Sequence, residues 1–128
     1  MKEKEYNLLS KQILDSAITV HKEMGPGLIE SIYKYCLLAE LRNRGMKAES
    51  QVCLPLFYKG EDLNKDFRMD ILIENEIIIE IKAVDMLQPV HEAQIRSFLK
   101  LAGKRLGFLI NFNVPLLKNG FRRFENNY

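Results

Sequence analysis

The first third of the chain carries apolar residues at helical spacing. One stripe predicts a helix over residues 7–24, and Gly25-Pro26-Gly27 ends it because glycine and proline interrupt helical backbone. A second helix is predicted over residues 28–44, with Gly45 placed to cap its C-terminus. The stripe of the first helix consists of Leu9, Ile13, Ala17, Val20 and Met24.

Beyond the second helix the pattern changes from helical spacing to short apolar runs typical of strands. Pro89 fits the first turn of a third helix that ends at Gly103. The strands are predicted over residues 51–58, 67–74, 77–84 and 106–112, with a polar turn at 59–62 and a short edge strand near Phe121. The element order is therefore αα-βββ-α-β, which predicts one α/β domain over residues 1–128, with a mixed central sheet flanked by helices.

The hairpin between residues 67 and 84 is expected to bring two carboxylates together. If Glu74-Asn75-Glu76 is a three-residue loop, Ile73 pairs with Ile77 and Asp70 lies opposite Glu80, whereas a two-residue loop would shift this register. Strand alternation then assigns one wholly apolar face to the core. That face consists of Met69, Ile71, Ile73, Ile77, Ile79 and Ile81, and the opposite face carries Asp70, Leu72, Ile78, Glu80 and Lys82.

Opposed carboxylates on neighbouring strands repel each other. They either share a proton or bind a cation. One interpretation is a solvated outer face on which Lys82 balances the charge. The favoured interpretation is a site for Mg²⁺ (or Mn²⁺), with one oxygen each from Asp70 and Glu80, the Ile81 backbone carbonyl and waters. Lys82 is expected on the same face, where it can orient or deprotonate the attacking water.

Two motifs resemble a known group of enzymes. Asp70 followed by Glu80-Ile81-Lys82 resembles the D…(D/E)xK signature of the PD-(D/E)XK nuclease superfamily, although Met69 replaces the proline of the literal motif. Gly27-Leu-Ile-Glu30-Ser-Ile-Tyr33 matches the GxxExxY pattern that names a family of small proteins assigned to that superfamily. The resemblance extends over residues 20–115 and implies a restriction-endonuclease-like core.

The resemblance also implies two further site residues. Glu30 matches a glutamate, on the helix before the sheet, that often joins the metal site. The alternative is a glutamate favoured by the dipole at the helix N-terminus. Gln94 matches the glutamine of a QxxxY element that arranges the metal site or the substrate, although Phe98 replaces its tyrosine. The alternative for Gln94 is a helix residue that bridges backbone groups.

Composition restricts the remaining possibilities. Cys36 and Cys53 fall in no Cys/His cluster, so neither a disulfide scaffold nor a zinc site is expected. No apolar run reaches the ~18 residues of a membrane span, and the first residues lack the apolar run of a signal peptide. We therefore expect a cytoplasmic protein without a membrane partner, and a homo-oligomer stays open. The net charge of +2 permits nucleic-acid binding without arguing for it.

Together these features predict Mg²⁺-dependent hydrolysis of nucleic-acid phosphodiester bonds, with DNA and RNA both open. The alternative is an inactive nuclease-fold module that binds a nucleic acid or a protein. A small-molecule binder finds no support, because the chain lacks a Gly-rich phosphate loop and a dinucleotide fingerprint. The basic side chains expected to meet a phosphate backbone are Lys100, Lys104, Arg105, Lys118, Arg122 and Arg123.

Overall fold

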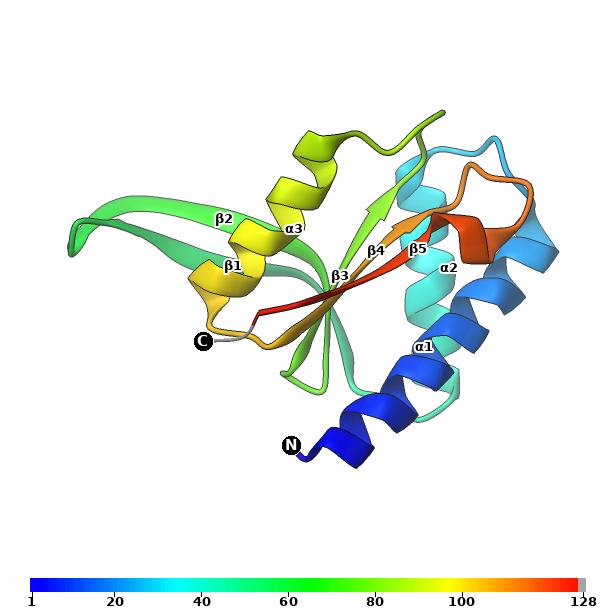
Figure 1. Ribbon diagram of the computed structural model, residues 1–128, viewed down its shortest axis with the longest axis horizontal. Coiled ribbons are helices and arrows are strands. Elements are labelled where there is room, and N and C mark those ends of the chain that lie inside the picture. The colour runs from blue at the N-terminus through cyan, green and yellow to red at the C-terminus, as the bar shows by residue number, and fades with distance from the viewer. Residues whose placement is uncertain (127–128) are drawn as a thin grey trace.

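A five-stranded sheet separates two helices on one face from a third helix on the other, in a computed structural model that describes residues 1–126 (Figure 1). The three helices are α1 (Glu3–Met24), α2 (Glu30–Asn43) and α3 (Pro89–Ala102). The strands are β1 (Ala48–Tyr58), β2 (Glu61–Ile73), β3 (Ile77–Lys82), β4 (Leu106–Asn111) and β5 (Phe121–Glu125), with a 3-10 turn η1 (Leu117–Gly120). This arrangement confirms the α/β fold and the element order expected from the sequence.

The sheet is mixed, with strand order β1-β2-β3-β4-β5. The β3 and β4 strands are parallel, and the other neighbouring pairs are antiparallel. A parallel pair needs a crossover connection, and α3 supplies it between β3 and β4. Because helices cover both faces of these central strands, every residue of β4 and all of β3 except Lys82 is buried.

Two apolar cores lie on the two sides of the sheet. The larger joins α1 and α2 to one face, with Ile13, Leu37, Ile71, Ile79 and Phe108 among its fully buried members. The smaller packs α3 against the other face and contains Met69, Leu72, Ile78, Ile95, Leu99, Leu109 and Phe124. None of the described helices is both long and apolar enough to cross a bilayer.

The β1–β2 hairpin is longer than its apolar pattern indicates. Residues 59–62 were expected to form a turn, but β2 already begins at Glu61, and residues 61–66 are all exposed. Pairing with β1 holds these polar residues in a strand without burying either face, so no alternation marks them. The outer part of this hairpin projects past α3 (Figure 1).

The alternation of side chains along β2 is interrupted near Asp70, so that Ile71 and Met69 point to opposite faces of the sheet. Gln51 has a φ of 54° and lies between the register pairs Ser50↔Ile71 and Val52↔Met69. Met69 belongs to the core under α3, so the expectation that it shares a face with Ile71 is wrong. Simple alternation assumes a continuous ladder, and the ladder is interrupted at this point.

Candidate active site

The register of the β2–β3 hairpin agrees with the sequence-based expectation. Ile73 pairs with Ile77, and the ladder continues to Ile71 opposite Ile79. The loop between them turns through Glu74 and Asn75, whose φ angles are 52° and 57°. The ladder therefore ends one residue before the two candidate carboxylates.

Asp70 and Glu80 interlock where β2 and β3 separate. The backbone N–H of Asp70 donates to Oε2 of Glu80 at 2.8 Å, and the N–H of Ile81 donates to Oδ2 of Asp70 at 2.8 Å. Each carboxylate thus accepts a hydrogen bond from the backbone of the other strand, in place of the ladder partner that the amide has lost. The local geometry brings the two acidic side chains into one place.

Glu80 is the more buried of the two acids, with 3% of its surface exposed. Burial, together with the nearby charges of Asp70 and Glu30, raises the pKa of Glu80 to about 8. The hydrogen bond from Asp70 and the charge of Lys82 act in the opposite direction. At neutral pH and without a cation, Glu80 therefore holds a proton, which relieves the repulsion between the two carboxyl groups.

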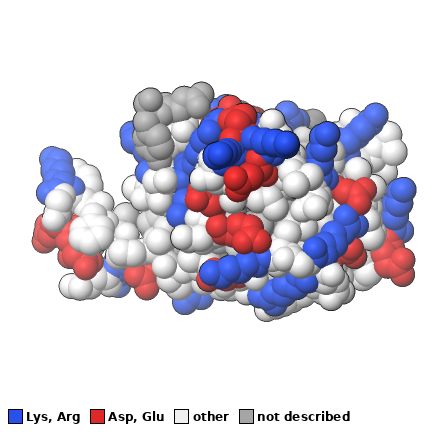
Figure 2. Space-filling view, turned by 90° about the horizontal axis from the view of Figure 1, so that it is seen from below, with Lys and Arg blue, Asp and Glu red and all other residues white. Residues whose placement is uncertain are grey.

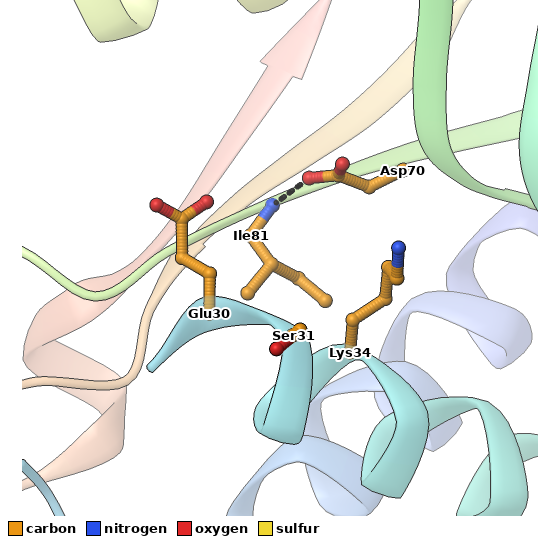
Figure 3. A pocket seen from close by; sticks show the side chains of 5 residues that line it. All are labelled: Glu30, Ser31, Lys34, Asp70 and Ile81. Carbon is orange, nitrogen blue, oxygen red and sulfur yellow. Dashed lines mark hydrogen bonds between the residues drawn. The ribbon is translucent and has the colours of Figure 1, made fainter. Parts of the chain in front are cut away.

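Asp70 lines a pocket between β3 and the start of α2. Its other lining residues are Glu30, Ser31, Lys34 and Ile81 (Figure 3). The pocket has a volume of about 190 Å³, which is room for several waters. Of the residues expected at the site, Glu30 and Asp70 therefore share a single hollow with Ile81.

Tyr33 fixes the loop that leads into Glu30, the first residue of α2. Its hydroxyl donates to the carbonyl of Gly25 at 2.6 Å and accepts from the N–H of Leu28 at 3.0 Å. The buried ring stacks on Phe112, with 4.6 Å between the ring centroids. The tyrosine of the Gly27–Glu30–Tyr33 motif thereby tethers the segment that carries its glutamate.

The backbone of Ile81 faces the same region. A strand residue points its N–H and C=O towards the same neighbouring strand. Because the N–H of Ile81 meets Asp70, its carbonyl oxygen is directed to the same side, where β2 has moved away. This orientation suits the carbonyl for the role expected of it.

Lys82 and Gln94 lie together on the α3 side of the sheet. Both line a second pocket, whose other lining residues are Val90, His91, Ala93 and Ser97. The charge of Lys82 reaches Glu80, since it lowers the pKa of that carboxyl. The candidate residues therefore form two groups, one on the α2 side and one on the α3 side, with Glu80 buried between them.

The donor set suits a hard divalent cation that keeps part of its hydration. Within residues 1–126, no three His, Cys, Asp or Glu side chains are grouped so that they could hold a metal ion unaided. Mg²⁺ typically takes only one or two carboxylates and completes its octahedron with water and phosphate. Asp70 and Glu80 are sufficient for that mode of binding.

Both histidines form hydrogen bonds with backbone groups. His21 is buried, and its Nε2 lies 2.7 Å from the carbonyl oxygen of Val114. His91 accepts a hydrogen bond from the Gln88 N–H at Nδ1 and caps the start of α3.

Sequence reasoning missed two residues near the site. Asn111 is buried and accepts from the N–H of Val84 while donating to its carbonyl, which holds the chain just after Lys82. Lys34 lines the pocket beside Asp70. Its position four residues after Glu30 could have indicated this, because such residues share a helix face. The pairing of Asn111 with Val84 left no comparable pattern in the sequence.

Two of the basic residues expected to meet a phosphate backbone have acidic neighbours. Arg105 pairs with Glu3, and Arg123 lies 2.9 Å from Glu125, so both are partly neutralised by acidic neighbours. On the face shown in Figure 2, acidic and basic side chains are interspersed instead of forming one basic field.

Comparison with known proteins connects this geometry to a family. The family model described as the PD-(D/E)XK nuclease superfamily matches residues 7–124, nearly the whole chain. The chain belongs to the PD-(D/E)XK nuclease superfamily. The enzymes of this superfamily typically use divalent metals.

The crystal structure of SSO0001 is similar in fold and in sequence. It matches with a TM-score of 0.53 and 25% identity over 77% of this chain. The match covers 50% of the SSO0001 chain, so the aligned part spans half the length of that chain. Comparison with curated proteins found no match.

Proposed function

We propose that this chain is a metal-dependent nuclease that hydrolyses phosphodiester bonds of a nucleic acid and uses Mg²⁺ (or Mn²⁺). The observation that carries the proposal is the interlocked pair of Asp70 and Glu80, next to Glu30 on one side and Lys82 on the other. A buried carboxyl with a pKa near 8 is costly to ionise without a cation, and perturbed groups of this kind concentrate at functional sites.

Each residue has a separate task in this proposal. Asp70 and Glu80 would hold the cation together with the Ile81 carbonyl, and Glu30 would complete its shell from the α2 side. When bound, the cation polarises the phosphate and lowers the pKa of a water. Lys82 positions the attacking water and stabilises negative charge that develops on the phosphate.

Gln94 orients Lys82 or the water from the pocket that it shares with that lysine. The usual tyrosine hydroxyl of the QxxxY element has no counterpart here. Phe98 instead stacks on Phe67 of β2, with 5.4 Å between the ring centroids. The proposed chemistry therefore omits that hydroxyl.

We also propose an assignment to one family within the superfamily. We place the chain in the GxxExxY family, supported by Gly27, Glu30 and Tyr33 and by the tethering role of the tyrosine. We propose that it acts as a single domain in the cytoplasm. Its Cys36 and Cys53 are free thiols, which fits a reducing compartment.

A second candidate function is an inactive nuclease-fold module that binds a nucleic acid or a protein. One observation favours it: Asp70 and Glu80 both accept hydrogen bonds from backbone amides of the neighbouring strand. The pair could therefore persist as a structural link between β2 and β3.

Cleavage of a mixed nucleic-acid panel separates the two functions. The wild type, Asp70→Asn, Lys82→Met and Asp66→Asn are incubated with Mg²⁺ or Mn²⁺ and with single- and double-stranded DNA and RNA. Asp66 is an exposed acid on the same strand and serves as the matched control. We expect the wild type and Asp66→Asn to cut, and the other two variants to be inactive although folded, because methionine keeps an apolar stem like that of Lys82.

Two results of this cleavage assay would contradict the nuclease proposal. A wild type that binds members of the panel and cuts none of them favours the binding module. Cleavage that survives in Asp70→Asn would come from a contaminant or from another site, and the proposed mechanism would then be wrong.

A further inference from the structure

Lys34 is a buried cation beside the acidic centre. It lies on α2, one turn after Glu30, and only 8% of its surface is exposed. Its stem is buried, and its ammonium group is directed towards the pocket that contains Asp70 (Figure 3). Buried lysines are normally paired with an acid.

Lys34 has no such acid. Among the described residues, the ion pairs within 4.0 Å do not include Lys34. Its Nζ instead lies 5.1 Å from the centroid of the exposed Tyr35 ring. No described side-chain nitrogen or oxygen is buried without a hydrogen-bond partner, so this ammonium group is open to the pocket. It is thus near the carboxylates without being neutralised by them.

We propose that Lys34 binds a backbone phosphate of the nucleic acid from the α2 side of the site. This inference rests on the proposed nuclease function and adds a substrate contact to it. A phosphate placed over Asp70 and Glu80 would have Lys82 on its α3 side and Lys34 on its α2 side. The cation that accompanies the substrate would screen the acids, and Lys34 would meet an oxygen of the incoming anion.

The contact between Lys34 and a phosphate can be measured through the salt dependence of nucleic-acid affinity. Each neutralised phosphate contributes about −0.9 to the slope of log affinity against log salt for duplex DNA, which is about eightfold in affinity at ~0.1 M salt. The contact is made in the bound substrate as well as in the transition state, so its loss raises KM and leaves kcat nearly unchanged. A purely structural lysine would change neither the salt slope nor KM alone.

The test compares Lys34→Met, Lys34→Arg and Lys11→Met with the wild type. Methionine keeps the apolar stem, arginine keeps the charge, and Lys11 is an exposed lysine on α1 that serves as the control. Binding to labelled duplex and single-stranded oligonucleotides is followed by fluorescence anisotropy, with Ca²⁺ in place of Mg²⁺, over a range of salt. Thermal melts establish that each variant is folded, and KM and kcat are measured with Mg²⁺.

The expected result is an approximately eightfold loss of affinity for Lys34→Met at ~0.1 M salt, with a salt slope shallower by about 0.9. Lys34→Arg should restore both, and Lys11→Met should behave as the wild type. The inference is overturned if folded Lys34→Met keeps the wild-type slope and KM. It is also overturned if Lys34→Met unfolds and folded Lys34→Arg binds with a reduced slope.

Failure of the inference differs from failure of the function on which it rests. If the wild type cuts and Asp70→Asn does not, an unchanged Lys34→Met removes only the phosphate contact. If the wild type neither binds nor cuts any oligonucleotide, the nuclease proposal fails and the Lys34 contact fails with it.

Discussion

The carboxylates of Asp70 and Glu80 occupy positions that a continuous β-ladder would give to backbone carbonyls. Each accepts an amide hydrogen bond across the strands, so neither group is an unsatisfied buried acceptor. What remains unfavourable is the ionisation of Glu80, because its carboxyl is buried and Asp70 is close to it. At the scale of single residues, the acidic centre is therefore a hydrogen-bonded unit that carries an electrostatic penalty.

Substitutions of Asp70 should separate the effect of its hydrogen bond from the effect of its charge on stability. Asp70→Asn keeps an oxygen that can accept from the Ile81 N–H and removes the charge, so the metal-free protein should be as stable as the wild type or more stable. Asp70→Ala leaves the Ile81 N–H without its partner and should lower the free energy of unfolding by about 1–3 kcal/mol. Urea unfolding with a chelator present measures both. A loss of several kcal/mol in Asp70→Asn would instead mark the charge itself as structural.

The raised pKa of Glu80 predicts opposite pH trends for stability and for metal binding. The folded-state pKa near 8 lies above the ordinary value of 4.5, so the folded protein binds this proton more tightly. The resulting stabilisation of the metal-free protein is complete below 4.5 and is lost as the pH rises towards 8. A cation must displace the proton, so Mg²⁺ affinity should rise over the same window and level off above it.

Calorimetry tests the second trend directly. Mg²⁺ titrations in buffers of different ionisation enthalpy should reveal up to one proton released per ion at neutral pH. Glu80→Gln should remove this group's contribution to the pH dependence of stability, while its side-chain oxygen still accepts from the Asp70 N–H. A Mg²⁺ affinity that stays constant between about pH 6 and 8 would contradict the assignment, because a group with this pKa must exchange its proton there.

At the scale of elements, short tethers position the helices around the acidic centre. The Gly25–Leu28 segment is held by the hydroxyl of Tyr33, and the ring of that tyrosine is packed on Phe112 of the opposite layer. The start of α2, with Glu30, is thus connected both to its own loop and to the sheet region after β4.

Tyr33→Phe should loosen this tether without opening the core. The ring stack on Phe112 is retained, while two hydrogen bonds to the Gly25 carbonyl and the Leu28 N–H are lost. We expect a loss of about 1–2 kcal/mol in unfolding free energy. Mg²⁺ affinity should also be weaker, because Glu30 is held less firmly. Tyr35→Phe on the exposed side of α2 is the control, and equal effects of the two substitutions would exclude the tethering role.

At the scale of the whole molecule, the sheet has a packed centre and a projecting arm. The outer residues of the β1–β2 hairpin pair with each other, as in Phe57↔Asp62 and Tyr58↔Glu61, and all four are exposed. The cores that position the acidic centre end nearer to Leu54. The arm is therefore structurally separable from the site.

Shortening the arm should leave the domain stable. Removal of Phe57, Tyr58, Glu61 and Asp62 deletes two register pairs and keeps the Lys59-Gly60 turn. The melting temperature should change by less than about 5 °C, which corresponds to roughly 1 kcal/mol for a domain of this size. Mg²⁺ binding should be unchanged. A larger fall in the melting temperature would show that the arm stabilises the centre of the sheet.

The sequence by itself determined the local features of this protein. Pro89 and Gly103 located α3, and the three-residue loop after Ile73 set the hairpin register that brings Asp70 near Glu80. These outcomes depend on residues only a few positions apart, whose backbone preferences and alternation are readable in one dimension. The shared apolar face of Ile71, Ile73, Ile77, Ile79 and Ile81 was predictable for the same reason.

Only the tertiary structure decided how the site is assembled. The face exchange at Met69 needs Gln51 on another strand, and the pKa of Glu80 depends on burial between layers. The division of the two lysines, Lys34 beside α2 and Lys82 beside α3, follows from the helices that cover each face. Desolvation and Coulomb energies depend on distances in space, and a sequence specifies those distances only through the packing of all its elements.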